Sequence, residues 1–159
     1  MSLDTQIQTL IENAPRDGST PQAIEAIAPV LKALAEQLRH REYYILQTPD
    51  GNWLTTTLSN RANPDLEKSV VYGFPSLEDA RASRPQTTER ELIAAPLPVT
   101  HLLFQMLAFD RVDSLIFFEI PGNRETGTEV KREDLQRAVR LQLQSYLQQK
   151  KSNIPPNLA

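Results

Sequence analysis

The apolar pattern of this chain changes its period at residue 42, and this change constrains the fold more than any other feature. Before it, apolar residues recur every three or four positions, as on one face of a helix: Ile24, Ile27, Leu31, Leu34 and Leu38. After it, residues 42–59 follow a period of two and are rich in β-branched and aromatic side chains, which is typical of strands. The chain is therefore expected to combine helices with a sheet.

Length and composition favour one folded unit. The chain has 159 residues, of which 40% are hydrophobic and 23% charged, and a chain of this size buries roughly 70% of its unfolded surface. We expect a single globular domain over residues 1–149 and a mobile tail over residues 150–159. The formal net charge of −3 gives no general attraction to phosphate backbones, so nucleic acid is not an expected partner.

A tight hairpin is predicted around Asp50 and Gly51, because this dipeptide accepts the positive φ angles of a two-residue turn. With that loop, Gln47 would pair with Leu54. Alternation then separates two sets of side chains, with Tyr43, Ile45, Leu54 and Leu58 on one face and Tyr44, Leu46, Trp53, Thr55 and Thr57 on the other. The apolar run at residues 69–75 is expected to extend the hairpin into an antiparallel meander.

Further patterns predict the elements around this meander. Ser76 followed by Asp79 is typical of a capping box that opens a short helix to about Ala82. Pro29 lies inside the helix that begins at Thr20, so a kink or break is expected near residue 28. The other expected elements are a helix at 3–13, an edge strand or extended linker at 91–98, a buried helix at 99–109, a strand covered on both faces at 112–120 and a helix at 131–149.

Together these elements predict an α+β fold. Its sheet is expected to be mainly antiparallel, with the three-stranded meander and one or two further strands. Helices from the amino-terminal and carboxy-terminal parts of the chain are expected to pack against the sheet.

The segment GNRETGT, residues 122–128, spaces its two glycines as in the phosphate-binding loop G-x-x-x-x-G-K-[ST]. That loop needs a lysine after its second glycine, whereas Gly127 is followed by Thr128 and Glu129. Only one helix is predicted downstream, which is too little for a nucleotide-binding fold. We interpret the segment as a strand-to-helix connection in which Arg124 and the following helix start are a weak anion-binding candidate.

Residues with catalytic or metal-binding chemistry are few. The absence of cysteine excludes thiolate catalysis, disulfides and sulfur-bound zinc. His40 and His101 fall in different predicted helices without ligand spacing, and no serine lies in a G-x-S-x-G elbow. We therefore predict no catalytic residue, no metal site and no cofactor, and an enzymatic role is the less expected one.

Aromatic residues concentrate in the predicted meander, at Tyr43, Tyr44, Trp53, Tyr72 and Phe74. Such residues stack bases in some RNA-binding sheets, but the acidic balance of this chain favours packing against helices. If helices cover one sheet face only, Tyr44, Leu46 and Trp53 form an exposed apolar patch on the other. This patch is predicted to bind a protein partner, with Trp53 partly exposed.

The last quarter of the chain resembles uncharacterised conserved proteins of cyanobacteria. The glutamine-rich segment LQLQSYLQQK and the closing NIPPNLA carry the resemblance, which includes no functional motif. It implies a cytoplasmic or thylakoid-peripheral accessory protein. The polar, acidic amino terminus and the absence of an apolar stretch near 18 residues also favour a cytoplasmic protein without a transmembrane segment.

Three functional hypotheses remain open at this point. The first is a non-catalytic protein-binding, assembly or regulatory accessory protein that acts through its sheet surface or its amino-terminal helices. The alternative is a small-molecule-binding protein or small enzyme with a pocket between sheet and helices, where His101, Arg111, Asp113 or Arg124 would supply polar groups. The third is a homodimer built on residues 20–40. A deep pocket with acids of perturbed pKa would favour the alternative, whereas a flat apolar patch would favour the first hypothesis.

Overall fold

The computed structural model describes residues 2–60, 62–85, 91–108 and 111–152. Within these ranges the chain forms helices at both ends and strands between them, which confirms the predicted α+β class. The helices are α1 (Leu3–Asn13), α2 (Thr20–Glu36), α3 (Leu77–Ala82), α4 (Val99–Ala108) and α5 (Arg132–Ser152). The strands are β1 (Glu42–Gln47), β2 (Thr56–Asn60), β3 (Asn63–Gly73), β4 (Ile93–Pro98), β5 (Ser114–Phe118) and β6 (Gly127–Lys131).

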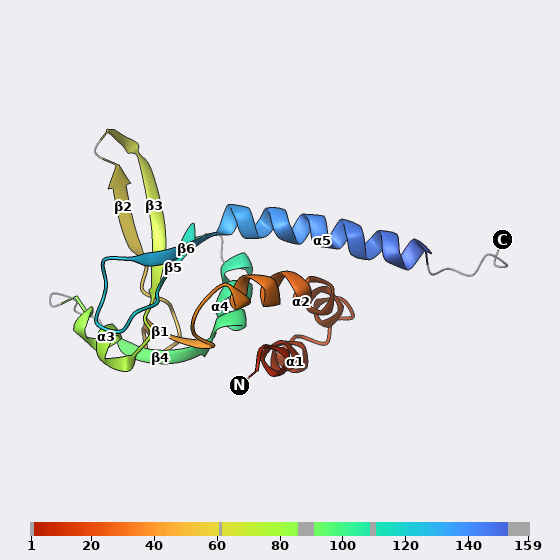
Figure 1. Ribbon diagram of the computed structural model, residues 1–159, viewed down its shortest axis with the longest axis horizontal. Coiled ribbons are helices and arrows are strands. Elements are labelled where there is room, and N and C mark those ends of the chain that lie inside the picture. Colours follow the sequence, from red (N-terminus) through yellow and green to blue (C-terminus); the bar gives the residue numbers. More distant parts are fainter. Residues whose placement is uncertain (1, 61, 86–90, 109–110, 153–159) are drawn as a thin grey trace.

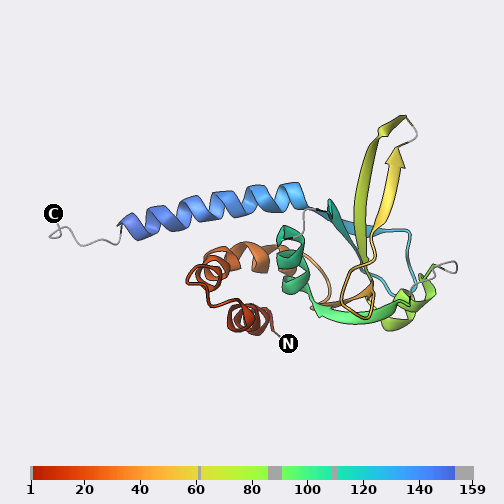
Figure 2. The same ribbon diagram turned by 180° about the vertical axis from the view of Figure 1, so that it is seen from behind.

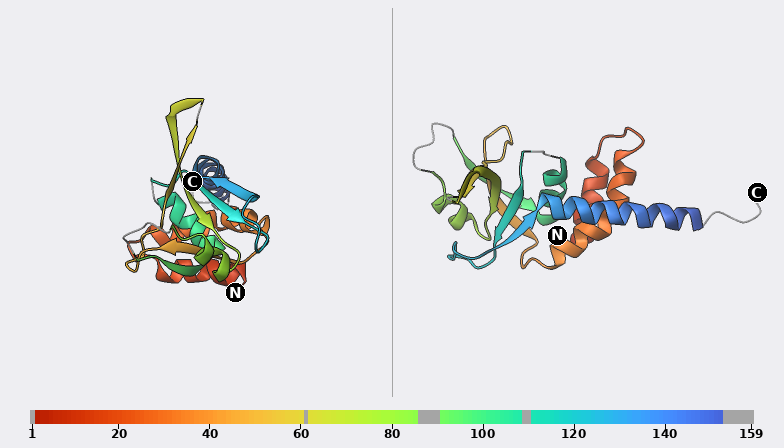
Figure 3. Two further views of the ribbon diagram at one scale, coloured as in Figure 1. Left: turned by 90° about the vertical axis from the view of Figure 1, so that its left-hand side faces the viewer. Right: turned by 90° about the horizontal axis from the view of Figure 1, so that it is seen from above.

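The helices and strands occupy opposite ends of the molecule. Helices α1, α2, α4 and α5 gather at one end, whereas the strands and the short α3 form the other (Figures 1 and 2). The β2–β3 arm projects from the body, and α5 carries the chain away from it toward the carboxyl end (Figure 3). The main helical packing therefore lies to one side of the sheet.

The strands form two sheets. Strand β1 pairs with β4 in an antiparallel ribbon, and the larger sheet has the order β2-β3-β5-β6. Its β3–β5 pair is parallel and the other two pairs are antiparallel, so the predicted mainly antiparallel arrangement is confirmed. A bridge between Tyr44 and Phe74, with N–H to carbonyl distances of 2.8 and 2.9 Å, joins the two sheets.

The predicted hairpin register is wrong by one residue. The amide of Gly51 donates to the carbonyl of Thr48 at 2.9 Å, which places Pro49 second in the turn, a position that its fixed φ favours. Gly51 then adopts a φ of +92°, and Gln47 pairs with Trp53 instead of Leu54. A shift of one residue exchanges the two faces of a strand.

The predicted three-stranded meander is also corrected. After Leu54 the chain no longer runs beside β1 and enters β2 of the larger sheet. The strand that pairs with β1 is therefore β4. The predicted pairing of the second run with the third is present as β2 with β3. Prolines in β4 suit its place in a two-stranded ribbon, because a proline cannot donate to a neighbouring strand.

The side chains of β5 separate two apolar clusters. Leu115 and Phe117 point into the main core, where they meet residues of α1, α2, α4 and β1. Ile116 and Phe118 point the other way, into a smaller cluster with Phe74. Strand β5 lies between β3 and β6, but Ile116 is only half-buried, so the predicted cover on both faces is incomplete on this side. The smaller cluster is therefore incompletely covered.

The helix α2 uses its apolar stripe inside this chain. Leu31 is fully buried in the main core, and Leu34 packs against that core, so the stripe proposed for a dimer contact is already covered. The helix continues through Pro29 and bends along its length (Figure 1), which agrees with the expected kink.

Two predicted helix boundaries have different outcomes. The side chain of Ser76 accepts a hydrogen bond from the amide of Asp79 at 3.2 Å, which confirms the cap of α3. Helix α5 continues to Ser152, beyond the predicted end at residue 149. The rest of the predicted tail, residues 153–159, lies outside the described residues.

Candidate functional site

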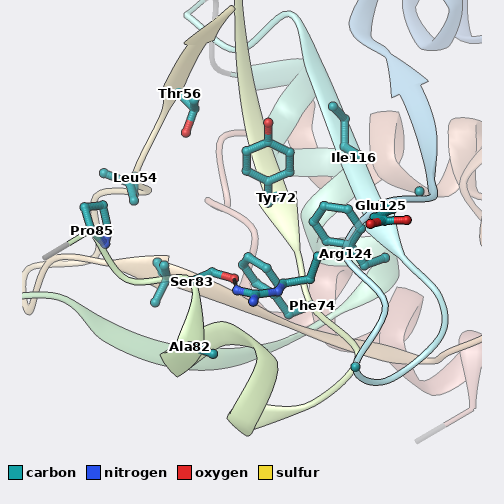
Figure 4. A pocket seen from close by; sticks show the side chains of 14 residues that line it. Leu54, Thr56, Tyr72, Phe74, Ala82, Ser83, Pro85, Ile116, Arg124 and Glu125 are labelled. Carbon is teal, nitrogen blue, oxygen red and sulfur yellow. Dashed lines mark hydrogen bonds between the residues drawn. The ribbon is translucent and has the colours of Figure 1, made fainter.

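An open cleft of about 880 Å³ lies on the sheet face that points away from the main core. The middle strands of the larger sheet form its floor, and α3, the β1–β2 connection and residues 119–127 form its sides (Figure 4). Its apolar lining comprises mainly Leu46, Leu54, Tyr72, Phe74, Ile116 and Phe118. The polar side chains of the lining are those of Thr56, Ser83, Arg124 and Glu125.

The floor of the cleft follows from alternation along two neighbouring strands. In the parallel β3–β5 pair, Tyr72 lies beside Ile116, and both are half-buried. The ring of Tyr72 stacks on Phe118 with centroids 5.4 Å apart and planes 15° apart, and Phe74 lies 5.5 Å from Phe118. Stacked aromatic rings are rigid and largely apolar, so the floor offers a preformed surface to an apolar ligand.

The loop at residues 119–127 is fixed to α3 by hydrogen bonds. The amide of Gly122 donates to the Asp79 carboxylate, with distances of 3.0 and 3.2 Å to its two oxygens. Gly122 has a φ of +82°, a conformation that favours glycine. At the other end of α3, Nη1 of Arg124 donates to the Ser83 hydroxyl at 2.8 Å. These contacts hold the guanidinium of Arg124 at the mouth of the cleft.

Gly127 allows the chain to pass close to the floor. A β-carbon at this position would lie 2.9 Å from Cγ2 of Ile116 and 3.2 Å from the carbonyl oxygen of Phe117. Both distances are shorter than ordinary carbon contacts, so a larger residue would displace the floor. The second glycine of GNRETGT is therefore explained by packing, not by phosphate binding.

Arg124 and Glu125 are the charged residues among the described lining of the cleft. Figure 4 shows the Arg124 guanidinium extending across the Phe74 ring toward Ser83, whereas the Glu125 carboxylate points away from it. Within the described ranges, Arg124 forms no ion pair. Its neutral hydroxyl partner leaves the cation uncompensated beside an apolar floor.

The three residues of the predicted patch do not share a face. Leu46 lines the cleft, and Tyr44 packs against the same small cluster. Trp53 packs against the main core on the opposite side, because the register differs by one residue from the predicted one. Leu54, which is predicted on the other face, lies opposite Leu46 instead. Trp53 is half-buried, in agreement with the predicted partial exposure.

The other polar residues proposed for a pocket do not converge on this cleft. Nε2 of His101 lies 3.0 Å from the carbonyl oxygen of Gln6, and Nε2 of His40 lies 2.8 Å from that of Glu119. Arg111 is exposed outside the cleft, and Asp113 accepts a hydrogen bond from the amide of Ser69 at 2.8 Å. No group of three metal-ligating side chains occurs in the described part of the chain.

Asp113 belongs to a second groove, of about 730 Å³, between the β2–β3 arm and the start of α5. Cations and acids both line this groove. At its edge, Lys68 forms an ion pair with Glu129, and the hydrogen bond from Lys68 lowers the pKa of that carboxyl. Because Lys68 pairs with Glu129 and Arg132 pairs with Asp113, these charges offset one another, and the groove does not favour a ligand of either sign.

Most residues of the floor and wall were not proposed as site residues from the sequence, among them Tyr72, Ile116, Phe118 and Ser83. The first three belong to runs with strand patterns, and period-two alternation identifies which of their side chains share a face. No local signal predicts that α3 covers only part of that face.

Comparison with models of known protein families finds no match, and comparison with curated proteins finds none either. Among the described residues, none of the helices has the length and apolar character needed to cross a bilayer.

Proposed function

We propose that this protein is a non-catalytic binding module, an assembly or regulatory accessory protein, that holds a segment of a protein partner in the cleft. The observation that carries the proposal is the incompletely covered apolar floor. Helices cover the opposite face of the same sheet, but Tyr72 and Ile116 remain half-buried. Partly exposed apolar surfaces of this kind are typical of interaction sites, where tyrosines often contribute much of the binding energy.

The polar groups at the cleft favour binding over catalysis. General acid–base chemistry needs at least one positioned proton donor or acceptor and a second group that activates or stabilises the reacting atoms. In the described lining, Arg124 and Glu125 point apart, and the histidines serve as hydrogen-bonding groups elsewhere in the fold. An arginine and a hydroxyl beside aromatic rings instead suit the recognition of a ligand.

A second candidate is a small-molecule carrier. The cleft volume of about 880 Å³ falls within the range of ligand sites, and its few polar groups lie at one end of an apolar surface. Native mass spectrometry of protein purified from its own cells tests this candidate. A bound compound of constant mass that is lost when Thr56 is replaced by Trp would support the carrier.

Site-specific cross-linking tests the protein-binding proposal. A photoreactive phenylalanine analogue is placed at Thr56, whose side chain lines the cleft, or at Thr57, its neighbour on β2, which is exposed and does not line the cleft. Because adjacent strand residues face opposite sides, Thr57 is a matched control. We expect one discrete partner adduct in cells from position 56 and none from position 57.

The cross-linked partner is then purified and titrated against the protein. Thr56→Trp fills the cleft with a bulky neutral side chain that strands accept well, whereas Thr57→Trp leaves the cleft open. We expect Thr56→Trp to weaken binding at least tenfold and Thr57→Trp to leave it within twofold. Equal affinities for the two variants, or equal adducts from the two positions, would remove the cleft from the proposal.

A further inference from the structure

Arg124 presents an uncompensated cation to an apolar cleft. One of its five N–H donors is directed to the Ser83 hydroxyl, and its side chain forms no ion pair with a carboxylate within the described part of the chain. The hydrogen bonds of Ser83 and of the Gly122–Asp79 pair fix the loop that carries it. The Ser83 hydrogen bond directs the exposed guanidinium toward α3 at the mouth of the cleft, where an incoming anion can reach its remaining N–H donors.

We propose that the cleft recognises a peptide segment in which large apolar side chains lie next to an acidic residue, and that Arg124 binds the carboxylate of that residue. The inference rests on the proposed function, because it names the chemistry of the bound segment. The apolar side chains of the segment cover Tyr72 and Ile116, while its carboxylate accepts hydrogen bonds from the guanidinium, the geometry in which arginine binds carboxylates best.

The charges around the cleft favour a carboxylate over a phosphate group. Glu125 contributes one negative charge to the lining, and the chain as a whole has a formal net charge of −3. A phosphate group carries about −1.5 to −2 charges at neutral pH, so it would meet more repulsion than a carboxylate with a single charge. A single arginine therefore matches a single carboxylate.

A library of displayed random heptapeptides tests the inference on the folded, full-length chain. The library is selected on the wild-type protein and on the Thr56→Trp and Thr57→Trp variants, which block or spare the cleft. It is also selected on Arg124→Gln, which removes the guanidinium, and on Arg140→Gln, which removes the same charge from the exposed surface of α5. Circular dichroism establishes that each variant is folded before selection.

We expect the wild type, Thr57→Trp and Arg140→Gln to enrich one group of peptides that combines large apolar residues with Asp or Glu. Thr56→Trp should not enrich this group, and Arg124→Gln should enrich apolar peptides without the acidic preference. If the enriched peptides bind the wild type but not Thr56→Trp and show no preference for acidic residues, the role of Arg124 is overturned and the proposed function stands. Failure of the wild type to enrich any peptide above Thr56→Trp would overturn both.

A matched pair of synthetic peptides then measures the contribution of the charge. For an enriched peptide and its Glu→Gln analogue, we expect the wild type to bind the acidic form about threefold to fivefold more tightly, as for an exposed charge pair. The preference should decrease with added salt and disappear in Arg124→Gln, while Arg140→Gln retains it. A preference that survives in Arg124→Gln would assign the carboxylate to another group.

Discussion

The buried hydroxyl of Tyr43 donates a hydrogen bond to Oε1 of Glu119 and so joins the start of β1 to the end of β5. The second carboxylate oxygen accepts the amide hydrogen of Arg39 at 2.7 Å, and the carbonyl of Glu119 accepts a hydrogen bond from His40. One glutamate therefore fixes the connection between α2 and β1 against the sheet. The short segment that follows α2 depends on this contact for its position.

This contact predicts a loss of stability at high pH. Burial, together with the Glu119 hydrogen bond, raises the pKa of Tyr43 above its ordinary value of about 10, so the folded state keeps a proton that the unfolded state releases. The free energy of unfolding should fall as the pH rises above about 10, by at most about 1.4 kcal/mol per pH unit from this group.

Urea unfolding between pH 8 and 10.5 measures this loss in the wild type, Tyr43→Phe and Tyr44→Phe. Tyr43→Phe should show a shallower decline, and at neutral pH it should be about 1–2 kcal/mol less stable because Glu119 loses a donor. Tyr44→Phe keeps the contact and should match the wild-type slope. Parallel curves for all three proteins would contradict the assignment.

Gln6 connects α1 to two other parts of the chain and is predicted to be a main polar contributor to stability. It is 1% exposed, its amide nitrogen donates to the carbonyl of Arg41 at 2.9 Å, and its amide oxygen accepts from the hydroxyl of Thr100 at 2.8 Å. Gln6→Leu removes all these bonds and leaves buried partners unpaired, at a cost of about 2–3 kcal/mol. The control Gln8→Leu, at an exposed position of the same helix, should change stability by less than about 0.5 kcal/mol. Equal melting temperatures would contradict this prediction.

Gly127→Ala is expected to disturb the floor of the cleft. The added methyl group would lie too close to Ile116 and to the backbone of Phe117, and such overpacking costs about 1–3 kcal/mol. Thermal unfolding measures the loss, and amide chemical shifts of β5 report whether the floor moves. A variant with unchanged stability and unchanged shifts would show that β6 can move away from β5 without cost.

Trp53 and Leu54 are adjacent residues on opposite sides of the sheet, and their replacement should have different effects. Trp53→Ala removes a side chain that packs against the main core and should lower stability by about 1–3 kcal/mol. Leu54→Ala removes part of the cleft lining and should weaken binding of cleft-selected peptides severalfold. Titration of both variants, after correction for the folded fraction, measures the difference. A larger loss of peptide affinity in Trp53→Ala would restore the role predicted for it from the sequence.

Much of the local structure could be predicted from residues that are close in the sequence. The Ser76 cap and the stripe of α2 follow from spacing, and the strand at Leu115 follows from its short apolar run, because these signals act over a few positions. The hairpin register could not be predicted as reliably. Asp50 with Gly51 favours a two-residue turn, whereas Pro49 favours a turn that begins one residue earlier. The two turns differ in register by one residue, which decides whether Trp53 or Leu54 pairs with the preceding strand.

The sequence by itself determined the fold class and the placement of most elements, and it indicated Arg124 as an anion-binding candidate. Only the tertiary structure decided which strands pair, that β1 joins β4, and that Arg124 faces an aromatic floor built from β3 and β5. The physical reason is the distance along the chain over which each effect acts. Propensities, caps and periods act between neighbours along the chain, whereas the cleft depends on which distant segments cover one sheet face and which part of that face they leave open.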